Sequence, residues 1–287
     1  MRGHDRRADH RITRQTVGVM ERIDNAGDER LSDYRALKDT AARRRIEGDE
    51  FFIAEGPVAI ERLIASEHRV RSVLVSERKY QRMAALFDCL DAPVYVVDNR
   101  LLLEIVGFDL HRGAIAAADR LPEPTIDDIL RGHRRIAVLE GLNDPENLGA
   151  IARSARAFGI EALVLDPTCI DPYTRRTVRV SMGEILFLPA ARVAPDVWPG
   201  VLDVIAAAGF ETWAMTPGAD SRDIWELEAP PRLAVMLGAE GPGLSPQALA
   251  GATRRVRLPI DPSVDSLNVG AAAAVAFAIV GRQTRTQ

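Results

Sequence analysis

The stretch RIAVLEGLNDPENLGAIARSARAFG, residues 135–159, decides the fold class of this chain. It opens with a short, mostly apolar run of the kind that forms a buried strand. In residues 143–159, apolar side chains recur at helical spacing up to Phe158, and we expect Asn147 to cap this helix and Gly159 to end it. A strand that leads directly into a helix is the building unit of a parallel sheet.

The same alternation continues to the end of the chain. It implies a mostly parallel sheet covered by helices on both faces, in which ligands bind beyond the carboxyl ends of the strands. The loops after Glu140, Met215, Leu237 and Ile260 are therefore the places to look for chemistry. Strands are predicted over residues 135–140, 162–166, 210–215, 233–238 and 255–260, and helices near 148–158, 197–208 and 267–281.

The first part of the chain has shorter α/β elements. A helix is expected after Pro57, where proline suits the first turn, and strands are expected around residues 73–75 and 93–98. The proline- and carboxylate-rich segment LPEPTIDDIL is the best candidate for a linker. We therefore predict a mobile tail over residues 1–15, a small α/β domain over 16–120, a linker over 121–130 and a larger domain over 131–287.

The composition excludes several classes of protein. The 287 residues are 47% hydrophobic and 27% charged, which is typical of a globular protein. Cys89 and Cys169 form no CxxC pair and the 5 histidines form no spaced ligand set, so we expect neither disulfides nor a metal site. The apolar run over residues 269–281 is shorter than the roughly 20 residues of a spanning helix. Without an apolar leader at the N-terminus, a cytoplasmic protein is expected.

Arginine dominates the basic residues, because Lys38 and Lys79 are the only lysines. The net charge of −4 excludes a general polycation, but local basic clusters on an acidic protein suit a partner such as folded RNA. A solvated surface is the alternative explanation for any single cluster. The clusters are Arg43, Arg44 and Arg45; Arg131, Arg134 and Arg135; Arg175, Arg176 and Arg179; and Arg254, Arg255 and Arg257.

Two later segments also follow predicted strands. LGAEGPGLS, residues 237–245, has glycines that let the backbone approach a ligand, with Glu240 among them. It matches neither a P-loop nor a dinucleotide-binding fingerprint. In LPIDPSVDSLNVGAAAAVAFAIVGR, residues 258–282, Ser266 or Asn268 could cap the following helix or face a ligand.

Taken in order, the three segments resemble the three motifs of the SpoU/TrmH family, the ribose 2′-O-methyltransferases of the SPOUT superfamily. The resemblance covers about residues 135–282, with Gly270 where many relatives have serine. The segment DPYTRRTVRVSMG, residues 171–183, is also similar to the family. A weaker resemblance relates residues 51–64 and 111–119 to a ribosomal-protein-like substrate-binding domain. The motif positions are Asn147 and Arg153, Gly238 and Glu240, and Ser266, Leu267 and Asn268.

This resemblance implies a deep trefoil knot in the C-terminal parallel-sheet domain, a rare topology, and a homodimer whose active site takes residues from both subunits. It also implies S-adenosylmethionine as cofactor, held largely by backbone groups, and no metal. The cofactor positions carried over are Met215, Thr216, Leu237, Gly238, Leu258, Ile260 and Leu267.

The reaction implied is transfer of a methyl group to a ribose 2′-hydroxyl. Because a guanidinium holds its protons tightly, we expect Arg153 to orient the hydroxyl and stabilise negative charge on it. Glu240 would orient Arg153 or Asn147, and Ser266 and Asn268 would form the loop that faces the substrate. RNA would be bound by the first domain, with rRNA favoured over tRNA, through Arg43, Arg44, Arg45, Arg175, Arg176 and Arg179.

Two other classes of function stay open at this point. A non-catalytic RNA-binding or ribosome-assembly factor would keep the fold without turnover, although Arg153, Glu240 and Asn268 together argue against loss of the site. A nicotinamide or flavin enzyme would need a GxGxxG fingerprint after an early strand. The loop after Glu140 reads GLNDPENLG, which disfavours that alternative.

Overall fold

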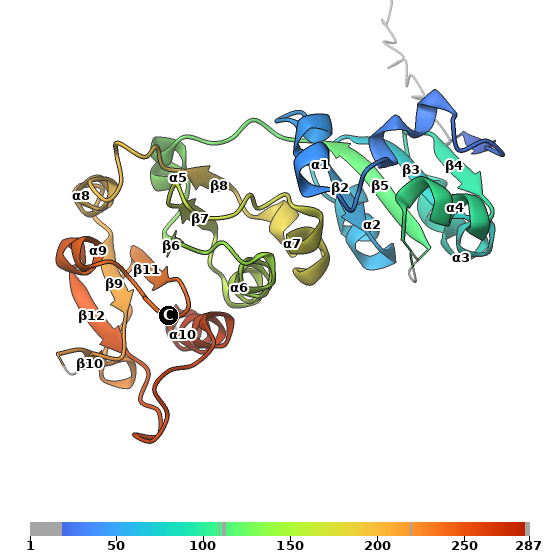
Figure 1. Ribbon diagram of the computed structural model, residues 1–287. Helices are drawn as coiled ribbons and strands as arrows, with labels where there is room; N and C mark the ends of the chain where they lie inside the picture. The colour runs from blue at the N-terminus through green and yellow to red at the C-terminus, as the bar shows by residue number, and fades with distance from the viewer. Residues whose placement is uncertain (1–18, 109, 111–112, 219, 285–287) are drawn as a thin grey trace, which may run out of the picture.

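The chain forms two α/β units, each built on its own sheet, joined by one extended segment (Figure 1). The predicted tail over residues 1–15 lies outside the described residues, so the structure does not test it. The computed structural model describes residues 19–108, 110, 113–218 and 220–284.

The N-terminal unit has a five-stranded mixed sheet in the order β1-β4-β3-β5-β2. Strand β5 runs antiparallel to both of its neighbours, and the other pairs are parallel. As predicted, Pro57 begins a helix. The strands are β1 Met20–Arg22, β2 Phe51–Glu55, β3 Val70–Ser76, β4 Val94–Val97 and β5 Ala114–Asp119; the helices are α1 Thr40–Glu47, α2 Pro57–Ile64, α3 Glu77–Phe87 and α4 Asn99–Val106, with a 3-10 turn η1 at Glu29–Tyr34.

The C-terminal unit has a seven-stranded sheet in the order β10-β12-β9-β11-β6-β7-β8, and every neighbouring pair is parallel. The prediction of a mostly parallel sheet is therefore confirmed. Because the strands are parallel, their carboxyl ends and the loops that follow lie along one edge. The strands are β6 Arg135–Glu140, β7 Ala162–Leu165, β8 Ala190–Arg192, β9 Glu211–Met215, β10 Arg222–Asp223, β11 Leu233–Gly238 and β12 Arg254–Arg257.

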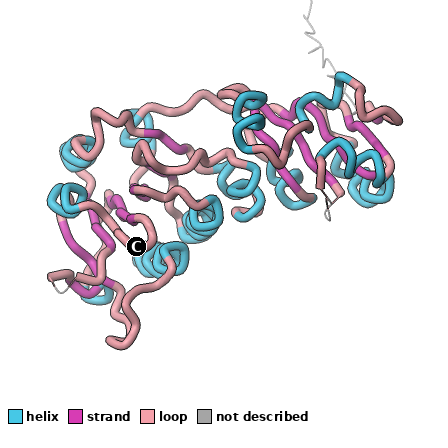
Figure 2. Tube along the Cα trace, viewed as in Figure 1, coloured by secondary structure: helices cyan, strands magenta, loops and turns pink. Residues whose placement is uncertain are grey.

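Helices cover both faces of this second sheet (Figure 2). Helices α6 and α10 pack on each other over one face, and α6 also packs on α7. Residues of α5, α8 and α9 form a separate apolar layer on the other face. The helices are α5 Ile126–Gly132, α6 Pro145–Phe158, α7 Arg175–Val180, α8 Val201–Ala207, α9 Pro246–Gly251 and α10 Val269–Thr284, with 3-10 turns η2 Glu184–Phe187 and η3 Ile224–Glu226.

One apolar core continues from the first unit into the second. It includes Phe52 and Ile60 of the N-terminal unit and Val178 of α7, which packs directly against β2. Gly183, with a φ of +81°, sits so close to α2 that an added Cβ would lie 2.7 Å from the Cβ of Arg62. A side chain at position 183 would therefore clash, and glycine allows the two units to meet closely.

Two helices begin after capping residues that the sequence prediction did not assign. Helix α6 is capped by Asp144, which accepts a hydrogen bond from the Glu146 backbone at 2.9 Å, so Asn147 is an interior residue of the helix and not its cap. Helix α5 begins at Ile126, where Thr125 and Asp128 form a capping box. The second half of the segment predicted as a linker is therefore helical.

The boundaries of one strand and one helix and the exposure of one side chain also differ from the prediction. The strand predicted over residues 255–260 ends at Arg257, so the positions up to Ile260 belong to the following loop. The helix predicted over 197–208 begins at Val201. Phe158, expected on the apolar stripe of α6, is 36% exposed at its end. Gly159 ends α6 in the left-handed conformation, as predicted.

Candidate active site

The three sequence segments meet at the carboxyl-end edge of the large sheet through Asn268. Its Nδ2 atom donates hydrogen bonds to Oδ1 of Asn147, at 3.0 Å, and to Oε1 of Glu240. Its Oδ1 atom accepts a bond from the Ala271 backbone at 3.1 Å, which caps α10. One side chain thus joins the loop after β11 to the starts of two helices. We call Asn147, Glu240 and Asn268 the amide–carboxylate cluster.

Glycine at position 270 allows this convergence. An added Cβ there would lie 3.1 Å from both the Cβ of Ala150 and Oδ1 of Asn268. Helices α6 and α10 are therefore very close at this point, beside the amide–carboxylate cluster. A Cβ at this position would be a tight contact, so the neighbouring side chains would have to shift slightly to accept it.

The glycine-rich loop after β11 folds back tightly on the end of its own strand. An added Cβ at Gly238 would lie 2.1 Å from the carbonyl carbon of Gly243, and the Gly243 backbone donates to the Ala239 carbonyl at 3.0 Å. Gly241 and Gly243 have φ of +87° and +70°, a conformation that suits glycine. This turn places Glu240 against Asn268.

The positions predicted to hold a cofactor lie at the ends of three adjacent strands, β12, β9 and β11. The Leu237 side chain is buried, which leaves only its backbone available at that edge. Leu258 and Ile260 are partly exposed, while Ser266 and Leu267 lie in the exposed stretch 261–268. The remaining positions, Met215, Thr216 and Gly238, are partly exposed.

Arg153 is not brought into the amide–carboxylate cluster within one chain. It lies six residues after Asn147 on α6, which corresponds to about 9 Å along the helix and a different face. Its exposed side chain lines a depression with Arg156, Ala157 and Glu184. Among the described residues it makes no hydrogen bond or ion pair. Its guanidinium is therefore available to a ligand.

The structure corrects one predicted RNA contact. The Arg43 side chain is buried, stacks on Phe51 and pairs with Glu47 at 2.6 Å, while it also donates to the carbonyls of Asp33 and Arg35. It is part of the core of the N-terminal unit and is not accessible to RNA. Arg45, on the same helix, is exposed. The structure does not describe the side chain of Arg44.

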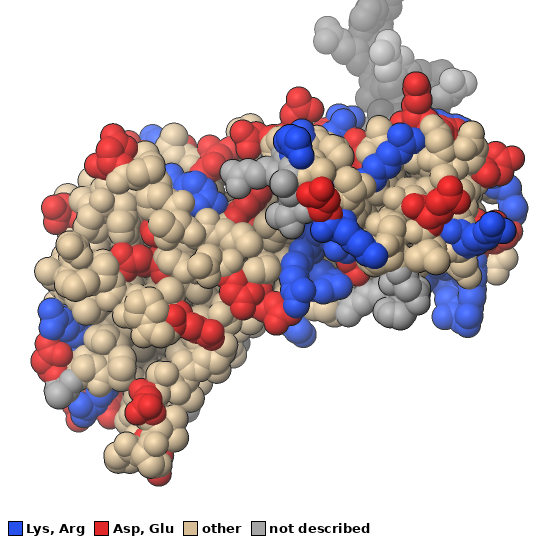
Figure 3. Space-filling model, in the orientation of Figure 1, with Lys and Arg blue, Asp and Glu red and all other residues tan. Residues whose placement is uncertain are grey.

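Two further predicted contacts hold the units together instead of facing solvent freely. Arg175 and Arg179 of α7 both bind the carboxylate of Glu55, which belongs to β2 and is buried. Burial lowers the pKa of Arg175. Arg176 pairs with Glu146 on the surface. Figure 3 shows basic side chains gathered where the two units meet.

Several residues that shape the site gave no recognisable sequence signal. Glu140, at the end of β6, accepts from Trp198 Nε1 at 2.9 Å and from the Ser245 backbone at 2.7 Å, which anchors the start of α9. Glu55 and Glu184 bind arginines of distant segments. One sequence does not reveal which residues more than a hundred positions apart are in contact. Co-variation of the two positions among related sequences would be the signal to look for.

Fold and site together define the class of protein: a two-unit α/β protein with a fully parallel sheet of the SPOUT methyltransferase type and a polar cluster at its ligand edge. The SpoU rRNA Methylase family matches residues 134–278. The chain belongs to this family.

Two relatives can be aligned with 87% and 89% of this chain. An uncharacterized tRNA/rRNA methyltransferase of Mycobacterium tuberculosis is 40% identical over 87% of this chain and 88% of its own length. The 23S rRNA (guanosine(2553)-2′-O)-methyltransferase RlmP of Bacillus subtilis is 25% identical over 89% of this chain and 97% of its own.

Solved structures agree with this fold. A crystal structure of an RNA 2′-O ribose methyltransferase is 30% identical, with a TM-score of 0.73, and covers 92% of this chain and 100% of that one. The AdoMet-bound rRNA methyltransferase from Sinorhizobium meliloti has a TM-score of 0.75 at 23% identity, over 92% of this chain and 98% of that one, and shows the shared fold. Among the described residues, no helix is long and apolar enough to cross a membrane.

Proposed function

We propose that this chain transfers a methyl group from S-adenosylmethionine to a ribose 2′-hydroxyl in folded RNA, with ribosomal RNA as the first candidate. The observation that carries the proposal is the convergence of Asn147, Glu240 and Asn268 at the ligand edge of the parallel sheet. The Bacillus subtilis relative is named for 23S rRNA, which supports rRNA, whereas the Mycobacterium tuberculosis relative is named for tRNA or rRNA. Transfer RNA is the second candidate.

The residues at the three strand ends fit this cofactor. Met215, Leu237 and Leu258 are uncharged residues at neighbouring strand ends, and the exposed stretch 261–268 beside them has backbone groups that can form hydrogen bonds. Glu240 provides a carboxylate, which suits a ligand with a positive sulfur centre. When bound, the cofactor supplies an activated methyl group on a sulfonium, a good leaving group.

The protein residues then have to align the hydroxyl and stabilise charge on its oxygen. Asn268 has both hydrogens of its amide directed at Asn147 and Glu240, so the three side chains fix one another's orientation. Arg153, with no partner among the described residues, is free to donate to the ribose hydroxyl and an adjacent phosphate. A guanidinium keeps its protons, so its role is to orient and stabilise.

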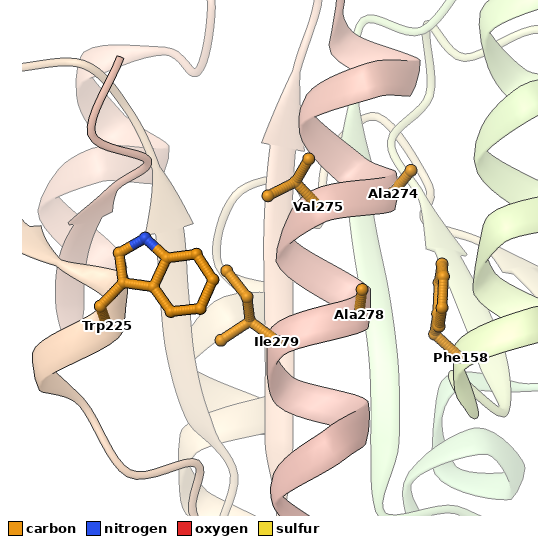
Figure 4. A pocket seen from close by; sticks show the side chains of 6 residues that line it. All are labelled: Phe158, Trp225, Ala274, Val275, Ala278 and Ile279. Atoms are coloured by element: carbon orange, nitrogen blue, oxygen red, sulfur yellow. The ribbon is translucent and has the colours of Figure 1, made fainter.

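We further propose a homodimer that pairs through α10, since one chain does not bring Arg153 to the amide–carboxylate cluster. An apolar depression of about 390 Å³ is lined by Phe158, Trp225, Ala274, Val275, Ala278 and Ile279 (Figure 4). Trp225 is 64% exposed and Val275 41% exposed. Such a patch favours association. A second copy is the occupant we favour, because Phe158 and Arg153 lie on the same helix, five residues apart, so pairing here would bring Arg153 of one subunit towards the other subunit.

The remaining parts of the proposal follow from the same resemblance. Residues 16–120 would bind RNA, residues 131–287 would form the catalytic domain, and the C-terminal segment would be knotted. Arg135, at the start of β6, donates to the Val280 carbonyl at 2.9 Å, which supports a C-terminal helix held against the middle of the sheet. Ribosomal RNA as substrate would place the protein in the cytoplasm.

The test is transfer of a labelled methyl group from S-adenosylmethionine to ribosomal RNA purified from cells that lack this protein. We expect label in ribose 2′-O-methyl groups with the wild-type chain and none with Arg153→Ala, while calorimetry shows unchanged cofactor affinity. Full turnover by Arg153→Ala would remove that residue from the mechanism. RNA binding without methyl transfer by the wild-type chain would support the non-catalytic alternative.

A further inference from the structure

The depression beside Arg153 has an excess of positive charge. It measures about 230 Å³ and is lined by Arg153, Arg156, Ala157 and Glu184. Arg62 of α2 reaches the same carboxylate, with Nε 3.1 Å from Oε1 of Glu184. Two guanidinium groups therefore pair with one carboxylate and a third, that of Arg153, lines the same depression unpaired, which leaves a net charge of about +2 and favours an anionic ligand.

The pairing within this depression is incomplete. Arg156 lies 3.7 Å from the other oxygen of Glu184, too far for a hydrogen bond, and its guanidinium stacks on Phe187 with the charge centre 5.2 Å from the ring centre. The stacking holds Arg156 in place while its donors stay largely unused. Glu184 is itself mostly buried, so it keeps its position between the arginines.

The size and position of the depression suit one unit of a polymer. Its volume is below the roughly 300 Å³ of ordinary small-molecule pockets. It lies where the two units meet, since Arg62 of α2 pairs with Glu184 in the wall of the depression, which the C-terminal unit forms. A chain of regularly spaced anions that crosses from one unit to the other would pass over it.

We propose that Arg62 and Arg156 form a binding site for one phosphodiester of the RNA, next to the nucleotide that Arg153 contacts, with Glu184 occupying the place of the phosphate in the free protein. This inference rests on the proposed function. RNA binding would exchange the Glu184 carboxylate for a phosphate, and both arginines would then contact the backbone bidentately. The exchange makes Glu184 a competitor of the substrate and not only a link between the units.

The experiment measures the affinity of a fluorescein-labelled fragment of ribosomal RNA over a series of salt concentrations. Arg156→Gln and Arg62→Gln should each weaken binding about 3- to 10-fold at low salt and lower the slope of log Kd against log salt. Together the two substitutions should lower this slope by about 0.7 to 0.9, the value for one phosphate contact. Glu184→Gln should tighten binding by a few-fold. Arg131→Gln, at an exposed ion pair of α5, is the matched control and should change neither quantity.

The two proposals fail in distinguishable ways. If the wild-type chain binds and methylates RNA but Arg156→Gln keeps the wild-type salt slope, the phosphate site is wrong and the proposed function stands. If Glu184→Gln weakens binding, the carboxylate is structural and the competition is contradicted. If the wild-type chain binds no RNA, both proposals fail. Thermal unfolding of each variant shows whether weaker binding comes from a lost contact or from a lost fold. The double variant Arg156→Gln with Glu184→Gln should keep the reduced slope of log Kd against log salt.

Discussion

The Nδ2 atom of Asn268 lies 3.0 Å from Oδ1 of Asn147, although 121 residues separate them in the chain. The same atom binds Glu240. Three distant segments thus depend on one amide for their relative positions. Replacing any of the three side chains should therefore affect the other two.

The first prediction concerns the amide itself. Asn268→Ala removes the cap of α10 and leaves Oδ1 of Asn147 without its donor. The free energy of unfolding should therefore fall by about 2 kcal/mol, and methyl transfer should be lost. Urea unfolding and labelled methyl transfer measure the two effects. Asn268→Asp keeps an acceptor for the cap but places a second carboxylate beside Glu240. It should restore part of the stability without activity, and an active Asn268→Asp enzyme would exclude a role for the amide donors.

Mixed dimers test whether Arg153 acts in the partner's site. Subunits with Arg153→Ala and subunits with Asn268→Ala are each expected to be inactive. If the site takes Arg153 from the other subunit, heterodimers contain one intact site, and a random mixture should recover about one quarter of wild-type activity. If both residues act within one subunit, the mixture stays inactive. Unmixed samples of each variant at the same concentration are the control.

The tight loop after β11 predicts a strong steric effect. Gly238→Ala places a Cβ 2.1 Å from the Gly243 backbone, which cannot be accommodated without moving the loop that carries Glu240. We expect a loss of more than about 2 kcal/mol in stability, together with loss of cofactor binding. Gly132→Ala, where an added Cβ has nothing within 4 Å, should be nearly neutral. Wild-type stability of Gly238→Ala in urea unfolding would contradict this packing.

The joint between the units depends on Glu55. Glu55→Gln leaves Arg175 and Arg179 without their buried counter-charge, and because both guanidinium groups are partly exposed we expect a loss of about 1 to 3 kcal/mol. Glu146→Gln breaks the exposed pair with Arg176 and should cost less than about 1 kcal/mol. Equal effects in thermal unfolding would show that the buried pair contributes no more than a surface one.

His68 predicts a dependence of stability on pH. Its ring packs against Phe52 and Tyr173 at the same joint, its Nε2 has no partner among the described residues, and burial lowers its pKa below the usual value. Near and below about pH 6.5 the unfolded chain therefore binds a proton at His68 more readily than the folded chain does. Stability should fall as the pH drops from 7 towards 5.5, by no more than about 1.4 kcal/mol per pH unit from this group.

The pH effect is measured as urea unfolding at several pH values. His68→Gln should flatten the dependence between pH 7 and 5.5, while His133→Gln, at the partly exposed end of α5, should leave the wild-type slope. The slope is the relevant quantity, because His68→Gln also changes the packing. An unchanged slope in His68→Gln would show that another group causes the dependence.

The features that could be predicted from the sequence are those that depend on residues close together in the chain. Apolar runs predicted five of the seven strands of the large sheet but missed β8 and β10. The family resemblance grouped Asn147, Glu240 and Asn268, and the structure brings these three side chains together. The helix cap was assigned wrongly because both Asp144 and Asn147 are capping residue types, and geometry selects the one whose side chain reaches a free backbone N–H.

Other features depend on three-dimensional packing and leave no local pattern. Three consecutive arginines at 43–45 gave no indication that Arg43 is buried against Phe51. The pairing of Glu55 with Arg175 joins residues 120 positions apart. Arg153, which the motif resemblance assigns to the site, lies away from Asn268 within one chain, and our proposal places it in the site of a second subunit.

Ribose methylation mapped site by site in ribosomal and transfer RNA from cells with and without this protein tests the central claim most directly. The proposed function predicts that one or a few 2′-O-methyl groups in ribosomal RNA are absent when the protein is absent and return with the wild-type gene but not with Arg153→Ala. A loss confined to transfer RNA would move the substrate to the second candidate. Identical methylation maps in the two strains would contradict the account.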